Sequence, residues 1–265
     1  MYDFKFHQPT SIREASQIIV ENEDAKFIAG GMTLLPTMKM RLASPTDLID
    51  LSNIQELYGL RDAGDSIEIA AMTTHAEIAA SELVRKAIPA LAYLANRIGD
   101  AQVRNRGTIG GSLSNSDPAA DYPAAVLGLD AVVKTDRRQI AAEEFFVSLF
   151  ETALEPDEIV KSVTFRKPAR AAYSKFPNPA SRYAVVGVMV TDIGANIRVA
   201  VTGAGPCAFR PALLETALSE NVSPDALNGL TVDADGFNED LFASAEYRAH
   251  LVVAMAKRAV AEIVV

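Results

Sequence analysis

Cysteine is nearly absent from this chain, with Cys207 the only one among 265 residues. One cysteine cannot form an intrachain disulfide, and a thiolate-held iron–sulfur cluster or structural zinc site needs several. Tryptophan is missing, and the three histidines (His7, His75 and His250) have no spacing typical of metal ligands. We therefore expect no metal site in this chain, and we interpret the histidines as structural or surface residues.

Long apolar runs and an excess of positive charge are also missing. No stretch approaches the ~20 apolar residues of a membrane-spanning helix, and the start of the sequence lacks the apolar core of a signal peptide. The formal net charge of -9 disfavours general binding to nucleic acid or to an anionic membrane. Hydrophobic residues make up 49% and charged residues 22%, a balance typical of a soluble globular protein. We expect a cytoplasmic protein without a membrane span.

Strands and helices alternate at the start of the chain, which predicts a small β-α-β-α-β unit. We expect strands near residues 4–6, 26–29 and 47–51, with a helix after Ser11 and another running through Leu34 to Leu42. A hairpin near residues 57–71 follows, and then a long helix over 82–98 with a break at Pro89. The fold class is α+β.

A domain boundary is predicted at Lys167–Arg170. The first domain covers residues 1–168, with lobes at about 1–53 and 54–168. The second covers 169–265 and combines antiparallel strands with helices. The chain has no repeats and no low-complexity linker, so we expect the two parts to pack tightly.

Two glycine-rich segments carry the strongest functional signal. The first, Ala29 to Thr33, lies between a strand and a helix, where glycine lets a ligand approach the backbone and the helix start favours an anion. A tight turn without a ligand is the alternative. The second, Thr108 to Ser112, lacks the third glycine of a Rossmann fingerprint and the lysine of a P-loop.

Small polar residues follow the second segment at high density. They can bind phosphate and ribose hydroxyls through hydroxyl, amide and carboxylate groups, and the plain alternative is a polar loop: Ser112, Ser114, Asn115, Ser116, Asp117 and Asp121. Neither a Ser/His/Asp arrangement nor a metal-ligand cluster is visible. The pattern therefore favours a protein whose bound cofactor carries the chemistry, and two phosphate-binding segments outside the common templates indicate a flavin dinucleotide.

The sequence resembles the FAD-binding medium subunit of the molybdenum hydroxylases, the group of carbon monoxide dehydrogenase and xanthine dehydrogenase. The resemblance covers essentially the whole chain in collinear order. It rests on these stretches: Ala29-Gly30-Gly31, Leu34-Leu35-Pro36, Ile98-Gly99-Asp100, Val103-Arg104-Asn105, Gly107 to Leu113, and Asp117-Pro118-Ala119-Ala120-Asp121.

The resemblance implies a two-lobed FAD-binding domain of the vanillyl-alcohol-oxidase-like (PCMH) type and a smaller C-terminal domain. It also implies roles for particular residues. Those implied to hold the pyrophosphate are Ala29, Gly30, Gly31, Met32, Thr33 and Leu34, with Thr108, Gly110, Gly111 and Ser112 opposite. Asp121 is implied to bind the ribityl or ribose side, Ala101 to line the flavin cleft, Val160 to pack near the ring, and Lys175 to lie near the isoalloxazine.

The resemblance further implies partners and a function. A large molybdenum-cofactor subunit and a small subunit with [2Fe-2S] clusters join this chain in a dimer of heterotrimers, and FAD passes electrons to NAD, a quinone or oxygen. The segment Pro177–Tyr183 departs from an arginine-rich stretch common in the family. Two alternatives stay open: a stand-alone flavin oxidoreductase of the vanillyl-alcohol-oxidase type, and a cofactor-free assembly or scaffold subunit.

Overall fold

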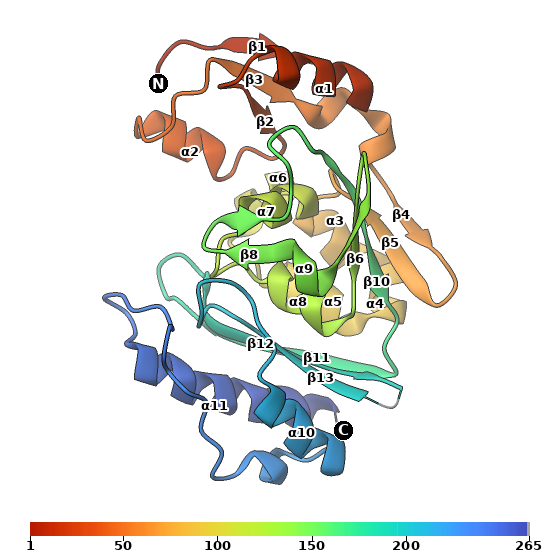
Figure 1. The fold of residues 1–265 in the computed structure, drawn as a ribbon. Helices are drawn as coiled ribbons and strands as arrows, with labels where there is room; N and C mark the ends of the chain where they lie inside the picture. Colours follow the sequence, from red (N-terminus) through yellow and green to blue (C-terminus); the bar gives the residue numbers. More distant parts are fainter. Residues whose placement is uncertain (195, 264–265) are drawn as a thin grey trace.

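The first fifty residues form the predicted alternating unit at one end of the molecule (Figure 1). The computed structural model describes residues 1–194 and 196–263. The elements of this lobe are β1 (Lys5–His7), α1 (Ile12–Glu21), β2 (Lys26–Ile28), α2 (Leu34–Lys39) and β3 (Asp47–Asp50). The strands are parallel in the order β1-β3-β2. Helix α2 ends earlier than predicted, because Arg41 takes a left-handed φ of 61° and Leu42 is left exposed.

An antiparallel sheet in the order β4-β5-β10-β6-β7 forms the second lobe. Its strands are β4 (Leu60–Asp62), β5 (Ser66–Ala70), β6 (Val132–Thr135), β7 (Gln139–Ala141) and β10 (Val160–Arg166). The short helices η1 (Leu51–Asn53) and η2 (Gln55–Leu57) precede the sheet. Between β7 and β10 the chain forms α9 (Ala142–Phe145) and the two-stranded pair β8 (Phe146–Ser148) and β9 (Glu151–Thr152). Alternate residues of β5 and β10 face the core, as a half-buried sheet requires. The β4–β5 hairpin is the one predicted from the turn at Asp62.

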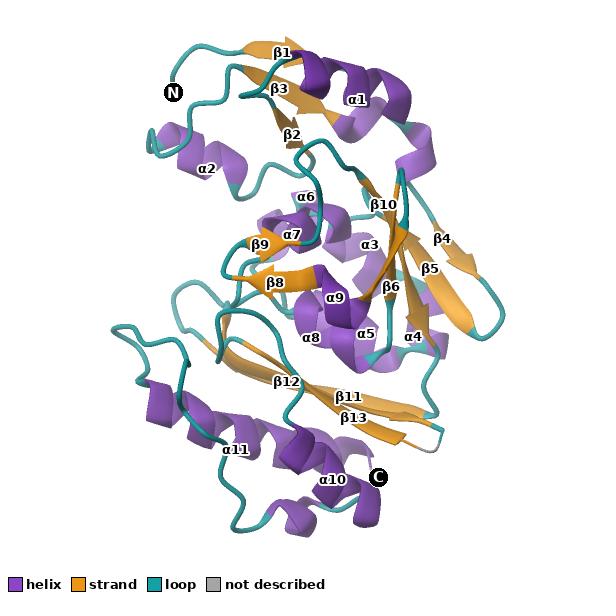
Figure 2. Cartoon of the chain, viewed as in Figure 1, coloured by secondary structure: helices purple, strands orange, loops and turns teal. Residues whose placement is uncertain are grey.

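Helices of the second lobe cover this sheet and lead to the glycine-rich region (Figure 2). They are α3 (His75–Ala80), α4 (Glu82–Ala87), α5 (Pro89–Asn96), α6 (Ala101–Arg106), α7 (Ile109–Asn115) and α8 (Tyr122–Gly128). The break at Pro89 is confirmed, since α5 starts there. The prediction of a loop at the second glycine-rich segment is wrong. This segment forms the first turn of α7, and the Thr108 side chain caps the helix by accepting from Gly111 N–H.

The remaining chain adds a third sheet in the order β11-β12-β13. Its elements are β11 (Arg170–Pro177), β12 (Ala184–Ile193), β13 (Asn196–Thr202), α10 (Ala212–Glu220), η3 (Pro224–Leu227) and α11 (Ala245–Ile263). One face of this sheet packs on α5 and α8 and the other on α10 and α11 (Figure 1). Both faces are buried, which explains the almost wholly apolar sequence of β12.

Candidate FAD-binding site

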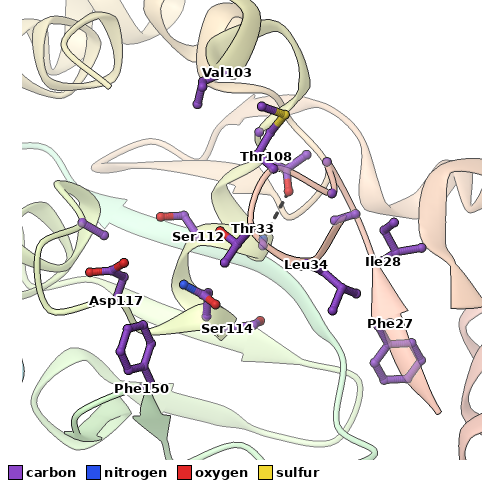
Figure 3. Close-up of a pocket in the computed structure, with 18 of the residues that line it drawn as sticks. Phe27, Ile28, Thr33, Leu34, Val103, Thr108, Ser112, Ser114, Asp117 and Phe150 are labelled. Atoms are coloured by element: carbon purple, nitrogen blue, oxygen red, sulfur yellow. Dashed lines mark hydrogen bonds between the residues drawn. The ribbon is translucent and has the colours of Figure 1, made fainter. Parts of the chain in front are cut away.

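A cavity of about 620 Å³ lies where the first lobe meets α6, α7 and the β8–β9 hairpin. This volume is within the ~300–1,000 Å³ range of small-molecule and cofactor sites. Figure 3 shows Thr33 and Ser112 in its middle, Phe27 to one side and Asp117 and Phe150 to the other. The cavity is therefore polar at its centre, with an apolar wall from β2.

The two glycine-rich segments contact each other across this site. A Cβ on Gly30 would lie 2.1 Å from the carbonyl oxygen of Arg106 and 2.8 Å from Cα of Gly107. A Cβ on Gly111 would lie 3.5 Å from Cβ of Ala29. Gly30 is thus required because another backbone segment occupies the place of a side chain.

The first segment leaves its backbone donors available to a ligand. Among the hydrogen bonds of the described residues, none uses the N–H groups of Gly31, Met32, Thr33 or Leu34. These residues line the cavity and lead into the first turn of α2. Successive N–H groups at a helix start suit an anion, both through hydrogen bonds and through the helix dipole.

The second segment uses its donors inside the protein. Ile109 N–H donates to Thr73 and Gly110 N–H to the Ala71 carbonyl, at 3.1 and 2.8 Å, and Gly111 N–H donates to Thr108 Oγ1 at 3.2 Å. The two segments therefore differ. The first offers backbone N–H groups, whereas α7 offers the side chains that line the cavity, Ser112, Ser114 and Asn115.

Two aspartates follow α7, and their surroundings differ. Asp121 accepts a hydrogen bond from Tyr173 at 2.6 Å and forms an ion pair with Lys175 at 2.8 Å. Burial raises the pKa of the Asp121 carboxyl, and the ammonium of Lys175 opposes this rise. Asp117 accepts from Ala119 N–H through one oxygen, and burial raises its pKa too. Both aspartates line the cavity.

Positive charge lies at and behind one edge of the cavity although the chain is acidic, since Arg182 lines the cavity and Arg104 lies against the backbone of Gly99, which also lines it. Arg104 donates to the carbonyls of Ile98 and Gly99 at 3.0 Å, and Arg182 donates to Gly99 at 3.3 Å. Among the described residues, the partners of both guanidinium groups are carbonyl oxygens and not carboxylates. Because a carbonyl does not cancel a full charge, this edge favours an anionic ligand.

Most residues predicted for the site are brought together here. Those that line the cavity are Ala29, Gly30, Gly31, Met32, Thr33, Leu34, Thr108, Gly111, Ser112, Asn115 and Asp121. Four do not line it. Gly110 packs on Ala71, Val160 is buried in β10, Ala101 is exposed at the start of α6, and Lys175 is held by Asp121.

Sequence reasoning missed several cavity residues, foremost His75. Its side chain is 4% exposed and lies at the cavity wall. Burial, with a smaller contribution from Arg104, lowers its pKa from 6.5 to about 4. The capping box at Thr74 predicts a helix start, but the bridge from Thr74 to Thr108 is a tertiary contact that no local pattern reveals. Tyr183, the last residue of the Pro177–Tyr183 segment, is a second cavity residue that was not predicted for the site.

The free backbone N–H groups and the polar side chains of this cavity suit a dinucleotide, and comparisons with known proteins support this interpretation. Residues 2–167 match the family described as FAD binding domain in molybdopterin dehydrogenase. The chain is 35% identical to the nicotine 6-hydroxylase medium subunit of Paenarthrobacter nicotinovorans, over 97% of this chain and 96% of that protein. It is also 35% identical to the carbon monoxide dehydrogenase medium chain of Hydrogenophaga pseudoflava, over 97% and 95%.

A solved structure supports the same relationship. Carbon monoxide dehydrogenase from Hydrogenophaga pseudoflava, in a form that lacks the Mo-pyranopterin moiety, matches with a TM-score of 0.89 and 34% identity, covering 99% of this chain and 97% of that one. The chain therefore belongs to the FAD-binding medium-subunit family of the molybdenum hydroxylases. It is a flavoprotein of the oxidoreductase class, and the resemblance stated from the sequence is confirmed. None of the described helices is long and apolar enough to cross a membrane.

Proposed function

We propose that the cavity between the two glycine-rich segments holds FAD, with its pyrophosphate on the N–H groups of Gly31 to Leu34. The observation that carries this proposal is that Gly31 to Leu34 line the cavity and that their N–H groups have no acceptor among the described residues. The two segments have different roles in this proposal. The first binds the anion, and α7 supplies hydroxyl and amide groups that suit a ribityl or ribose chain.

The carboxylates at the end of α7 have separate roles in this proposal. Asp117 binds a hydroxyl of the cofactor, because its second oxygen has no partner among the described residues. Asp121 is buried, and its ion pair keeps Lys175 in place. From the cavity wall, the Asp121 carboxylate also contacts the ribose part of FAD. The arginine edge near Gly99 stabilises negative charge on the ligand.

We further propose that the chain relays electrons within a larger enzyme. FAD, when bound, exchanges electrons singly and in pairs. A small partner subunit with [2Fe-2S] clusters supplies electrons, a large subunit with the molybdenum cofactor oxidises the substrate, and an external acceptor (NAD, a quinone or oxygen) receives them. The assembly is a dimer of heterotrimers in the cytoplasm, where a single unpaired cysteine is usual. The chain spans nearly the full length of its medium-subunit relatives, which supports this role.

The test is to purify the native complex through a tag on this chain and to assay molybdenum, iron and FAD together. We expect all three, with reoxidation of the dithionite-reduced complex by one of the acceptors. A matched complex carrying Gly30→Ala should keep molybdenum and iron, retain less FAD and reoxidise more slowly, in proportion to its FAD content. A chain that purifies without iron and molybdenum, or whose reoxidation does not depend on FAD, contradicts the relay.

A further inference from the structure

Two buried polar atoms close to the cavity have no hydrogen-bond partner within residues 1–194 and 196–263. They are Nδ1 of His75 and the hydroxyl of Tyr122. The two rings contact each other, with centroids 5.3 Å apart and planes tilted by 53°. Buried polar atoms are nearly always hydrogen-bonded, so an unpartnered pair in one place calls for an explanation.

The His75 ring is fixed at the cavity wall by its backbone. Thr74 caps α3 through Glu77 N–H, and the Glu77 carboxylate accepts from Thr74 N–H at 2.8 Å. His75 N–H donates to the carbonyl of Gly107 at 3.0 Å. The ring lies against Gly107, where a Cβ would be 2.5 Å from Nε2. Because Gly107 also contacts Gly30, the imidazole is placed beside the meeting point of the two glycine-rich segments.

The imidazole is neutral at physiological pH. Burial lowers the pKa of the ring to about 4, and the charge of Arg104 adds to this effect. The ring also lies in the first turn of α3, where the positive dipole end disfavours a cation. A neutral ring donates through one nitrogen and accepts through the other. It can therefore donate a hydrogen bond to an oxygen of a ligand without the cost of burying a charge.

We propose that His75 is a binding residue for FAD, donating a ring N–H to an acceptor oxygen of the pyrophosphate–ribityl part. This inference rests on the proposed placement of FAD in the cavity. His75 lines the cavity, whereas Tyr122 does not. The unpartnered Nδ1 of His75 is sealed from solvent beside the Tyr122 ring, so the nitrogen that donates to FAD is Nε2, which lies next to Gly107 at the cavity wall. The two residues therefore make opposite predictions for substitution. Replacing His75 removes a ligand contact, and replacing Tyr122 removes only a buried hydroxyl.

Three variants of the full chain test the proposal: His75→Leu, His75→Gln and Tyr122→Phe. The readouts are the dissociation constant for FAD, measured on FAD-stripped protein, and the urea midpoint of the FAD-free chain. We expect His75→Leu to bind FAD about 10- to 100-fold more weakly, as for a lost hydrogen bond to a charged group. Its FAD-free form should be at least as stable as wild type, because an unsatisfied buried polar atom is gone.

The other two variants separate a binding role from a structural one. His75→Gln keeps a donor and should recover part of the affinity, and Tyr122→Phe should bind FAD as wild type does. Wild-type affinity in His75→Leu overturns the proposal, as does a joint loss of affinity and of stability in its FAD-free form. If the wild-type chain itself takes up no FAD, the proposed function has failed, and this inference fails with it.

Discussion

Gly30→Ala is the substitution that most directly probes the contact between the two glycine-rich segments. The new Cβ would lie 2.1 Å from the carbonyl oxygen of Arg106 and 2.7 Å from its carbonyl carbon. Both are backbone atoms, so no side-chain rotation relieves the overlap. The segments must separate, which moves the N–H groups of the first segment away from the hydroxyl groups of α7.

The expected cost follows from overpacking. Inserting a methyl group into a close-packed backbone contact costs about 1–3 kcal/mol, and the same displacement acts on the cofactor site. If between half and all of that strain is relieved when the cofactor is absent, FAD affinity falls by about 2- to 150-fold. The assay is titration of FAD-stripped chain with FAD, followed by flavin fluorescence, together with urea unfolding of the FAD-free form.

Gly64→Ala is the matched control. Gly64 has a φ of +86° and nothing within 4 Å of a Cβ, in the β4–β5 hairpin outside the cavity wall. Alanine at this position therefore takes on about 1–2 kcal/mol of backbone strain without any contact with FAD. We expect lower stability with unchanged affinity. Gly30→Ala binding FAD as tightly as Gly64→Ala would refute the reasoning.

Three further predictions concern charged groups. Glu158, hydrogen-bonded to Arg138, has its pKa lowered from 4.5 to about 2, so its stabilisation is present above pH 4.5 and lost as pH falls toward 2. Glu158→Gln should therefore be about 2–3 kcal/mol less stable in urea at pH 7 and equal to wild type near pH 2; an equal deficit at both pH values contradicts this. Lys175→Met leaves the buried Asp121 carboxylate without its counter-ion and should lower the free energy of unfolding by about 3–5 kcal/mol. The double variant with Asp121→Asn should recover most of this loss; purely additive effects of the two substitutions would show that the two residues do not interact. Arg182→Glu reverses a charge at the positive edge and should weaken FAD binding by less than about tenfold, more at low salt than at high salt; an effect independent of salt argues against electrostatics.

Elements with local signals were predictable. Pro89 marks a helix start because its ring has no N–H to donate, and α5 begins there. The Thr74 capping box is present with both of its hydrogen bonds. The alternating apolar pattern of the first fifty residues also gave the correct order of strands and helices.

The predictions about the site that are wrong or missing concern residues whose positions depend on tertiary contacts. Gly110 and Gly111 disfavour a helix by intrinsic propensity, yet both lie in the first turn of α7. Gly110 is required there because a Cβ would lie 2.6 Å from Cβ of Ala71. The first N–H groups of α7 donate to the carbonyls of Thr73 and Ala71, which lie more than 30 residues away in the chain. A local sequence pattern does not reveal such contacts. For the same reason no local pattern indicates that His75 lies at the cavity wall.

The most direct test of the account is a crystal structure of the chain loaded with FAD. We expect the pyrophosphate within hydrogen-bond distance of the N–H groups of Gly31 to Leu34, and a ring nitrogen of His75 next to a cofactor oxygen. FAD bound outside this cavity contradicts the central claim. So does a pyrophosphate held by the N–H groups of α7, which would have to leave their present partners.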